Sequence, residues 1–434
     1  MSFPAYPEYK DSGVVWLGGI PAHWNIKKFR YVFEESPEKI TDEVVGDMLS
    51  VSGYRGIEVK QYDDEGRRRT DEELFGYRVV RPGQLVVNTM WLNYAGLGVS
   101  EHEGHVSPAY RSYWIDPAMD KRFIHHLMRS GTYVQGYTRL LTGIRPNSLQ
   151  MGRDDLMVFP VLLPTKSEQT QIARFLDHET ARIDALIEEQ QRLIELLKEK
   201  RQAVISHAVT KGLDPTVPMK DSGVEWLGEV PAHWNAIHVG RVCRKVSDGP
   251  HFSPNYVDEG VMFLSARNIA VDAWHLEDAK FVSEEDYREF CRRVVPEKGD
   301  VLYTKGGTTG IARVVDLDEK FQVWVHVAVL KLDRELVDPY YMAFSLNSAG
   351  CYEQSQLHTR GATNQDLGLT RMTKIWFALP PREEQTRICD FLNAELGNID
   401  DLIAEATKVV ALLSERRSAL ISAAVTGKID VRNW

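Results

Sequence analysis

The sequence predicts an α+β fold in which two tandem globular domains are separated by two long helices packed as an antiparallel coiled coil. Two stretches, at 164–214 and 380–430, are copies of one another and have helical periodicity. A shorter motif also occurs twice, at 10–25 and 220–235, so each half of the chain runs in the order motif, dissimilar middle, helix. Such a chain is effectively circular, which indicates a pseudo-two-fold arrangement of its halves.

The two helical stretches align without a gap at an offset of 216 residues, and roughly half of their positions are identical. Thr165 and Glu168 form a capping-box pattern at the start of the first copy, and Pro381 is the matching first-turn proline of the second. Gly212 and Gly427 stand where these helices are expected to end. Each stretch is therefore predicted to form one long helix.

Apolar positions spaced alternately three and four residues apart form a heptad seam in each helix, with a few polar interruptions. We predict that its apolar members pair the helices or bind a partner. The seam positions are Leu176, Glu179, Ile183, Leu186, Gln190, Leu193, Leu197, Lys200 and Val204, and then Leu392, Glu395, Ile399, Leu402, Ala406, Val409, Leu413, Arg416 and Leu420. Further apolar residues widen the stripe beyond a two-helix seam, which predicts contact with additional helices: Ile187, Ile194, Ile205, Ile403, Val410 and Ile421.

These features divide the chain into a globular domain over 1–160, a helical spacer over 161–215, a second globular domain over 216–378 and a second helical spacer over 379–434. Gly83 and Gly299 precede equivalent strands as turn residues. Short strands are predicted at Gln84–Asn88, Arg111–Ile115, Val261–Ser265, Asp300–Thr304 and Val323–Leu332, and short helices at Lys121–Arg129 and Glu284–Cys291. The middles have diverged while their flanks have not, so a shared frame carries two different surfaces.

Composition places the chain among ordinary globular proteins. It has 434 residues, of which 43% are hydrophobic and 26% charged. No apolar run approaches the ~20 residues of a membrane span, and no signal-peptide pattern is present. The four cysteines, all in the second half and without a CxxC pair, predict reduced thiols in a cytoplasmic protein. The formal net charge of −10 argues against non-specific coating of nucleic acid, but it allows local DNA reading with partners supplying phosphate contacts.

No catalytic motif is recognisable, and we predict no catalytic or metal-binding residue. Gly96–Gly98 is a lone GxG, without the Pro-Pro-Tyr or Pro-Pro-Phe motif that would accompany methyl transfer. Lys305–Gly310 is glycine-rich but lacks the Gly-Lys-Ser/Thr that holds phosphate and magnesium. The carboxylate-x-lysine patterns at Glu58–Lys60 and Asp278–Lys280 are too loose to indicate a nuclease.

Polar and aromatic residues in loops at matching places of both middles are the candidates for reading DNA. Arginine and lysine read guanine, and asparagine and glutamine read adenine, in the major groove. The candidates are Ser52, Tyr54, Arg55, Asn88, Trp91, Asn93, Tyr94, Arg145, Asn147 and Ser148 in the first domain, and His251, Ser253, Ser265, Arg267, Asn268, Lys305, Thr308, Thr309, Arg360, Thr363, Asn364 and Gln365 in the second. Ordinary loop polarity is the alternative interpretation of each one.

Several motifs together are typical of one protein family. They are the repeated KDSGVVWLGGIPAHWN and KDSGVEWLGEVPAHWN, the stretch DGPHFSPNY at Asp248–Tyr256, the helix start PPREEQTRICDFL, and the helix ends ISHAVTKGLD and ISAAVTGKID. Through them the chain resembles the specificity (S) subunits of type I restriction-modification systems, over both halves and nearly the whole length. Asn88–Tyr94 departs from the Gly/Thr-rich loop usual there, which leaves the reading residues of the first domain open.

The resemblance implies two target recognition domains that each read one part of a bipartite, asymmetric DNA site, with the helices fixing the gap between them. It also implies a non-enzymatic chain without its own cofactor. Two methyltransferase (M) subunits would dock on it and use S-adenosylmethionine, and translocase-nuclease (R) subunits would use ATP and Mg. Two other functions stay open at this point: a stand-alone DNA adenine methyltransferase or nuclease, and a coiled-coil scaffold without DNA readout.

Overall fold

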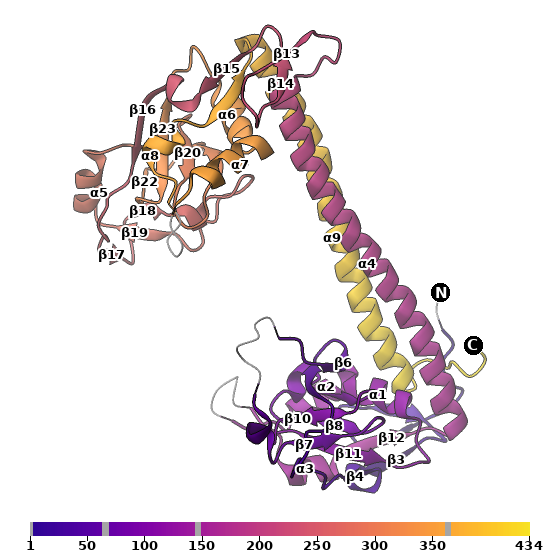
Figure 1. Ribbon diagram of the computed structural model, residues 1–434. Helices are drawn as coiled ribbons and strands as arrows, with labels where there is room; N and C mark the ends of the chain where they lie inside the picture. Colours follow the sequence, from indigo (N-terminus) through magenta and orange to yellow (C-terminus); the bar gives the residue numbers. More distant parts are fainter. Residues whose placement is uncertain (1–2, 63–68, 144–148, 361–365) are drawn as a thin grey trace. The chain divides into compact units, whose positions relative to one another are not determined.

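The computed structural model describes residues 3–62, 69–143, 149–360 and 366–434. The chain folds into two compact units, the first comprising Met1–Gln191 and Thr407–Trp434 and the second Arg192–Ala406 (Figure 1). The unit boundaries fall inside the two long helices, so each unit contains part of both. The predicted four-segment division of the chain stays a prediction.

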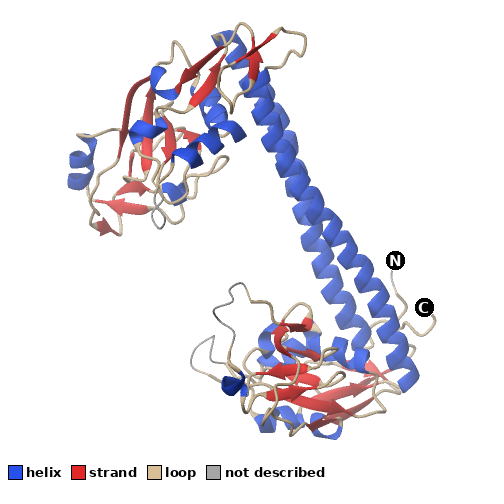
Figure 2. Cartoon of the chain, in the orientation of Figure 1, coloured by secondary structure: helices blue, strands red, loops and turns tan. Residues whose placement is uncertain are grey.

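The first unit combines short strands with helices (Figure 2). Its strands pair as two four-stranded sheets, in the orders β6-β5-β10-β7 and β4-β11-β8-β9, and as the two-stranded ladders β1-β2 and β12-β3. The strands are β1 (Tyr9–Asp11), β2 (Gly19–Pro21), β3 (Asn25–Lys28), β4 (Phe33–Glu35), β5 (Asp47–Ser52), β6 (Gly56–Val59), β7 (Arg78–Val80), β8 (Leu85–Val87), β9 (Leu97–Val99), β10 (Gly104–Val106), β11 (Arg111–Ile115) and β12 (Pro160–Leu163). The helices are α1 (Lys121–Arg129), α2 (Gly131–Thr138), α3 (Arg153–Val158) and part of α4 (Lys166–Lys211).

The second unit is built on a similar plan. It has four-stranded sheets in the orders β16-β23-β20-β21 and β17-β19-β18-β22, and the ladders β13-β14 and β15-β24. The strands are β13 (Met219–Asp221), β14 (Glu229–Pro231), β15 (Asn235–His238), β16 (Cys243–Asp248), β17 (Tyr256–Val257), β18 (Val261–Leu264), β19 (Lys280–Val282), β20 (Val301–Thr304), β21 (Ala312–Val314), β22 (Phe321–Val323), β23 (Val327–Leu332) and β24 (Trp376–Leu379). The helices are α5 (Glu284–Cys291), α6 (Pro339–Leu346), α7 (Ala349–His358), α8 (Leu369–Met372) and part of α9 (Arg382–Val425).

The α+β fold class is confirmed, and the predicted strands are present with one exception. The run Val323–Leu332 is not a single strand: it contains the end of β22 and the whole of β23, which lie in different sheets. A turn closed by the Val327 amide donating to the Trp324 carbonyl separates them. Gly83 and Gly299 have φ of +87° and +81°, a backbone conformation that favours glycine, so both are the turn residues expected before β8 and β20.

Parts of both long helices belong to the hydrophobic core of each unit. In the first unit Tyr133 of α2, Phe175 of α4 and Leu420 of α9 belong to one buried cluster. In the second unit Tyr341 of α6 is fully buried, and its hydroxyl donates to the carbonyl of Val209 in α4 at 3.2 Å. Burial of such large side chains supplies most of the free energy that holds helix and globular body together.

The helix ends follow the predicted signals with one correction. The Glu168 amide donates to the Thr165 hydroxyl at 3.3 Å and the Thr165 amide to the Glu168 carboxylate at 3.3 Å, which completes the capping box of α4. Gly212 and Gly427, with φ of +75° and +73°, follow the helix ends. Pro381 lies just before α9 instead of in its first turn, and its carbonyl accepts the Glu384 amide at 2.9 Å.

The repeated motif clasps one end of each long helix in its own unit. In the first unit Trp24 donates to Glu168 at 3.4 Å, and His23 lies 2.8 Å from the same carboxylate at the start of α4. The Trp24 ring also covers the end of α9, since a methyl group added at Gly427 would lie 3.2 Å from it.

The second copy of the motif makes the same contacts. Trp234 donates to Glu384 at 2.9 Å and His233 lies 2.7 Å from that carboxylate, at the start of α9. A methyl group added at Gly212, just after α4, would lie 3.2 Å from the Trp234 ring. The motif is thus a packed anchor for the helix pair, as its tryptophans predict.

The helices pair antiparallel within each unit, as predicted, but the seam has a different register. The odd-numbered seam positions, counted from Leu176 in α4 and from Leu392 in α9, are buried or half-buried. At the even-numbered positions, the side chain that faces the partner helix belongs to the next residue along the chain. Thr180, Ile187, Ile194 and Arg201 are inward in α4, and Leu396, Ile403 and Arg417 in α9; Val409 and Val410 are both half-buried. Leu186, Leu193 and Leu402 are exposed, whereas Leu176, Ile183, Leu197, Leu392 and Ile399 are buried and Leu413 is half-buried. Both registers have heptad spacing, and adjacent apolar residues such as Leu186 and Ile187 fit either one. Side-chain packing therefore decides which register the helices adopt.

Candidate nucleic-acid interface

Two of the candidate segments in the first unit lie against each other. Ser52–Arg55 forms the turn between β5 and β6, and Asn88–Tyr94 forms the connection between β8 and β9. A methyl group at Gly53 would lie 2.6 Å from the Tyr94 carbonyl oxygen, so the two loops approach as closely as glycine allows. The structure therefore brings residues of both predicted segments to one place.

The side chains of these loops divide into exposed and structural ones. Tyr54, Arg55, Trp91 and Tyr94 are exposed, and the rings of Trp91 and Tyr94 pack edge to face with centroids 5.8 Å apart. Ser52 and Asn93 are half-buried. Asn88 is buried and its side-chain oxygen accepts the Met90 amide at 3.2 Å, so it shapes the turn instead of facing solvent. Exposed aromatic rings and an exposed arginine are side chains suited to base contacts.

The third candidate segment of the first domain, with Arg145, Asn147 and Ser148, lies outside the described residues. Its flanks are placed: Thr142 and Gln150 exchange backbone hydrogen bonds of 3.1 and 2.9 Å. The Met151 amide then donates to the Thr89 carbonyl at 3.1 Å. The described flanks therefore lie beside the loop that carries Trp91.

In the second unit, Lys305 is the centre of a buried ion-pair network. The residue is only 5% exposed. Its ammonium lies 3.3 Å from the carboxylate of Asp248, at the end of β16, and 3.3 Å from that of Asp366. Asp248 also pairs with Arg293, which in turn contacts His251 at 2.9 Å. Lys305 is thus not available to a base. Lys305 links Asp248, at the end of β16, to Asp366, whose backbone pairs with that of the candidate residue Arg360.

The other second-unit candidates surround this network with mixed exposure. Exposed side chains are those of His251, Ser253, Arg267, Thr308 and Arg360. Thr309 is buried against Gln356. Asn268 is buried and accepts the Ser265 amide at 2.8 Å, which makes half-buried Ser265 and Asn268 a capping pair. Thr363, Asn364 and Gln365 lie outside the described residues.

Acidification should weaken the second unit through Asp248. Burial acts to raise the pKa of this carboxyl, but the Arg293 hydrogen bonds and the Lys305 charge outweigh it and lower the pKa. A lowered pKa contributes stability that is present above the unfolded-state value of about 3.9 and is lost as the pH falls through the folded-state value. We expect Asp248→Asn to lower the free energy of unfolding at pH 7 by about 3 kcal/mol, because it removes the buried anion that faces the buried Lys305 ammonium.

Urea unfolding of the two proteins between pH 7 and pH 3 measures this effect. The wild-type stability should fall more steeply below pH 4 than that of Asp248→Asn. Asp401→Asn, an exposed carboxylate on α9, is the control and should follow the wild type. Parallel pH profiles for wild type and Asp248→Asn would contradict the role given to this carboxylate.

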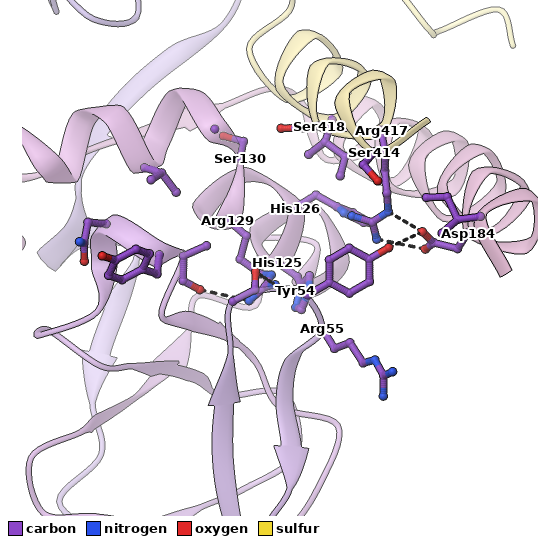
Figure 3. A pocket seen from close by; sticks show the side chains of 18 of the residues that line it. Tyr54, Arg55, His125, His126, Arg129, Ser130, Asp184, Ser414, Arg417 and Ser418 are labelled. Carbon is purple, nitrogen blue, oxygen red and sulfur yellow. Dashed lines mark hydrogen bonds and ion pairs between the residues drawn. The ribbon is translucent and has the colours of Figure 1, made fainter. Parts of the chain in front are cut away.

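Several residues that organise these loops were not foreseen from the sequence. Arg129 and Arg293 have no motif around them, and only their contacts with loop backbones and with Asp248 reveal them. Arg129, Tyr54, Asp184 and Arg417 line a cavity of about 1130 Å³ between the first-unit loops and the helix pair (Figure 3). Figure 3 shows Tyr54 and Arg417 converging on Asp184, while Arg55 points away from the helices.

Two further properties bear on what the chain can do chemically. Among the residues that the structure describes, no group of three or more His, Cys, Asp or Glu side chains is arranged to hold a metal ion. In the same described ranges, no helix is long and apolar enough to cross a membrane.

Comparison with known proteins gives consistent matches. Residues 273–410 match the family model described as type I restriction modification DNA specificity domain. The chain is 22% identical over 322 residues to the type I restriction enzyme EcoKI specificity subunit of Escherichia coli (strain K12), covering 71% of this chain and 66% of that relative. It is 20% identical over 320 residues to the EcoBI specificity subunit of Escherichia coli, covering 72% of this chain and 66% of the relative. The chain thus spans just under two thirds of the length of these relatives.

A solved structure supports the fold assignment. It is described as the structural basis underlying complex assembly and conformational transition of the type I R-M system, and it overlays with a TM-score of 0.70. The match covers 94% of this chain and 98% of the other at 15% sequence identity. At that identity the likeness establishes a shared fold.

Proposed function

We propose that this chain, which belongs to the family of specificity subunits of type I restriction-modification systems, recognises a bipartite, asymmetric DNA site for a multi-subunit enzyme. Each unit reads one part of the site, and the chain itself catalyses no reaction. The observation that carries this proposal is that the two units share a common framework but present different surfaces. Both units have two four-stranded sheets, two ladders and the same helix clasp, and the order β4-β11-β8-β9 matches β16-β23-β20-β21, yet the units expose different side chains at equivalent loops.

The exposed side chains suit base recognition of two kinds. In the first unit Trp91 and Tyr94 offer exposed rings and Arg55 an exposed guanidinium, a combination that favours apolar and stacking contacts together with hydrogen bonds from one arginine. In the second unit Arg267 and Arg360 are exposed, and the paired N–H donors of a guanidinium match the acceptors on the guanine edge. Because the chain carries a net charge of −10, most phosphate contacts are assigned to partner subunits.

The partners would bind the long helices. Exposed leucines on α4 and α9 give each unit apolar surface that the helix pair itself does not cover: Leu186 and Leu412 in the first unit, and Leu193, Leu196 and Leu402 in the second. We assign this surface to two methyltransferase (M) subunits, with translocase-nuclease (R) subunits joining the complex. S-adenosylmethionine, ATP and Mg would be bound by those subunits, and the complex would act in the cytoplasm.

Exchanging residues 26–160 for the same segment of another family member should change one half of the recognised site and leave the other. The exchanged segment begins in β3 and ends in β12, which pair with each other, so both joins lie at one ladder. The methylated motif of the complex, read by sequencing that detects methyladenine, measures the change.

The matched exchange in the second unit runs from β15 to β24, whose pairing is the same. It should change only the other half of the motif. An alteration of both halves by either exchange would refute modular reading. Methylation or cleavage of DNA by the purified chain alone would favour a stand-alone enzyme, and a complex without sequence preference would favour a scaffold.

A further inference from the structure

Arg129, the last residue of α1, lies beneath the two loops that carry the candidate reading side chains of the first unit. Its guanidinium donates to the carbonyl oxygens of Ser52 at 3.1 Å and Gly53 at 2.9 Å in the first loop. It also donates to those of Leu97 at 2.6 Å and Ala95 at 3.3 Å, directly after the second loop. One side chain therefore ties the backbones of both loops together.

The hydrogen bonds of Arg129 are all directed at backbone. Within the described ranges, no carboxylate lies at ion-pair distance from it, which is unusual for a largely buried guanidinium because an unpaired buried charge costs free energy. Burial and then the nearby positive charge of Arg417 lower its pKa to about 10, so it stays charged at neutral pH. The four carbonyl oxygens, together with the more distant negative charge of Glu58, compensate this charge, and moving either loop would remove two of the carbonyls.

A second contact holds the first loop from the side of the helices. Tyr54 donates to Asp184 of α4 at 2.9 Å, and the Arg417 guanidinium of α9 lies 5.0 Å from the Tyr54 ring centre. The Asp184–Arg417 ion pair, at 2.8 Å, has an exact repeat equivalent in the second unit, Asp400–Arg201 at 3.0 Å. The ion pair therefore belongs to helix pairing, and Tyr54 is an addition that attaches the reading loop to it.

We propose that Arg129 is a positioning residue that sets the base preference of the half-site read by the first unit. The proposal rests on the DNA-reading function proposed above. Arg129 touches no base; it fixes the separation between the Ser52–Arg55 turn and the Trp91–Tyr94 loop, so their exposed side chains form one surface. Hydrogen bonds to base edges need heavy-atom distances of about 2.7–3.2 Å, so loops that shift by an ångström lose discrimination.

The test is Arg129→Gln in the full chain assembled with its methyltransferase subunits. Methylation is measured on DNA in which every position of both half-sites is varied. Glutamine is shorter and has one amide group, so it cannot reach both loops. We expect discrimination at one half-site to fall by about 10-fold, the scale of one base contact, with the other half-site unchanged. Arg129→Lys keeps the charge and three donors and should give an intermediate loss.

Two variants complete the experiment. Arg122→Gln on the same helix removes ion pairs with Asp177, 2.8 Å away, and Asp120, 3.9 Å away, and should leave both half-sites unchanged. Gly53→Ala adds a methyl group that meets the Tyr94 carbonyl, so it separates the loops without altering Arg129 and should relax the same half-site. Unchanged preference in a folded Arg129→Gln complex, or equal loss in both halves, would overturn the proposal.

Amide hydrogen exchange separates this proposal from the function on which it rests. Arg129→Gln should speed exchange at 52–56 and 94–98 and leave the other strands of the unit unchanged. Unchanged exchange there would refute the clamp whatever the DNA result. A wild-type complex without any sequence preference would instead refute the proposed DNA-reading function, while faster exchange in the variant would still establish the clamp.

Discussion

Replacing Leu186 and Leu193 together by glutamate should abolish assembly with methyltransferase subunits while leaving the chain folded. The two side chains are 46% and 41% exposed on α4, so their loss uncovers no core. Exposed substitutions usually change stability by less than about 0.5 kcal/mol. A leucine buried by a partner commonly contributes about 2 kcal/mol or more when it is central to an interface, so the pair should weaken assembly by at least ~100-fold.

The control for added charge is Lys198→Glu, an exposed position on the same helix that does not share the heptad position of Leu186 and Leu193; it changes the charge by the same amount as the two leucine substitutions. Titration followed by mass photometry gives the affinity, and circular dichroism gives the fold. By contrast, Ile187→Glu places a charge between the paired helices and should unfold the first unit. Wild-type affinity in the Leu186/Leu193 variant would show that partners bind elsewhere.

Trp24→Ala should destabilise the first unit, and Trp234→Ala the second, by about 3–5 kcal/mol each. Both rings are fully buried, and each covers the end of one long helix while its indole N–H donates to a carboxylate in the first turn of the other. A loss of this size is a large part of the roughly 5–15 kcal/mol that holds a domain folded. At about 2–4 °C per kcal/mol, the melting transition of the affected unit should fall by roughly 10 °C.

Calorimetry of the full chain measures this loss, with Trp91→Ala as the matched control. Trp91 is 55% exposed, so its removal should change stability by less than about 1 kcal/mol while altering base preference. Trp24→Phe keeps a ring but removes the indole N–H, and should fall between Trp24→Ala and wild type. Equal stability losses for Trp24→Ala and Trp91→Ala would show that the motif is not a clasp.

The repeat structure accounts for how much of the fold the sequence predicted. Helix starts and ends follow from local signals, because the capping box at Thr165 and Glu168 and the glycines after each helix act within one turn. Strands such as β11 and β20 follow from composition over four or five residues. The prediction of a single strand at Val323–Leu332 was wrong, because three turn residues inside an apolar stretch leave no strong local signal in the sequence.

The candidate site was predicted less completely, because exposure is not a property of residue type. Arg55 and Lys305 look alike in the sequence as cations in polar loops. The first faces solvent, whereas the second is buried between Asp248 and Asp366, which lie far from it along the chain. Arg129 was not singled out at all, since a side chain that bonds to backbone carbonyls needs no partner residue that a pattern could reveal.

The sequence by itself determined the duplicated frame, the two long helices and the places where the two units differ, because all of these are periodic or repeated along the chain. Only the tertiary structure decided which of two equally apolar helix faces pairs inward, leaving Leu186, Leu193 and Leu402 exposed. It also decided which loop side chains are free to meet DNA. Both choices depend on contacts between segments distant in sequence, where packing and the compensation of buried charge select one arrangement.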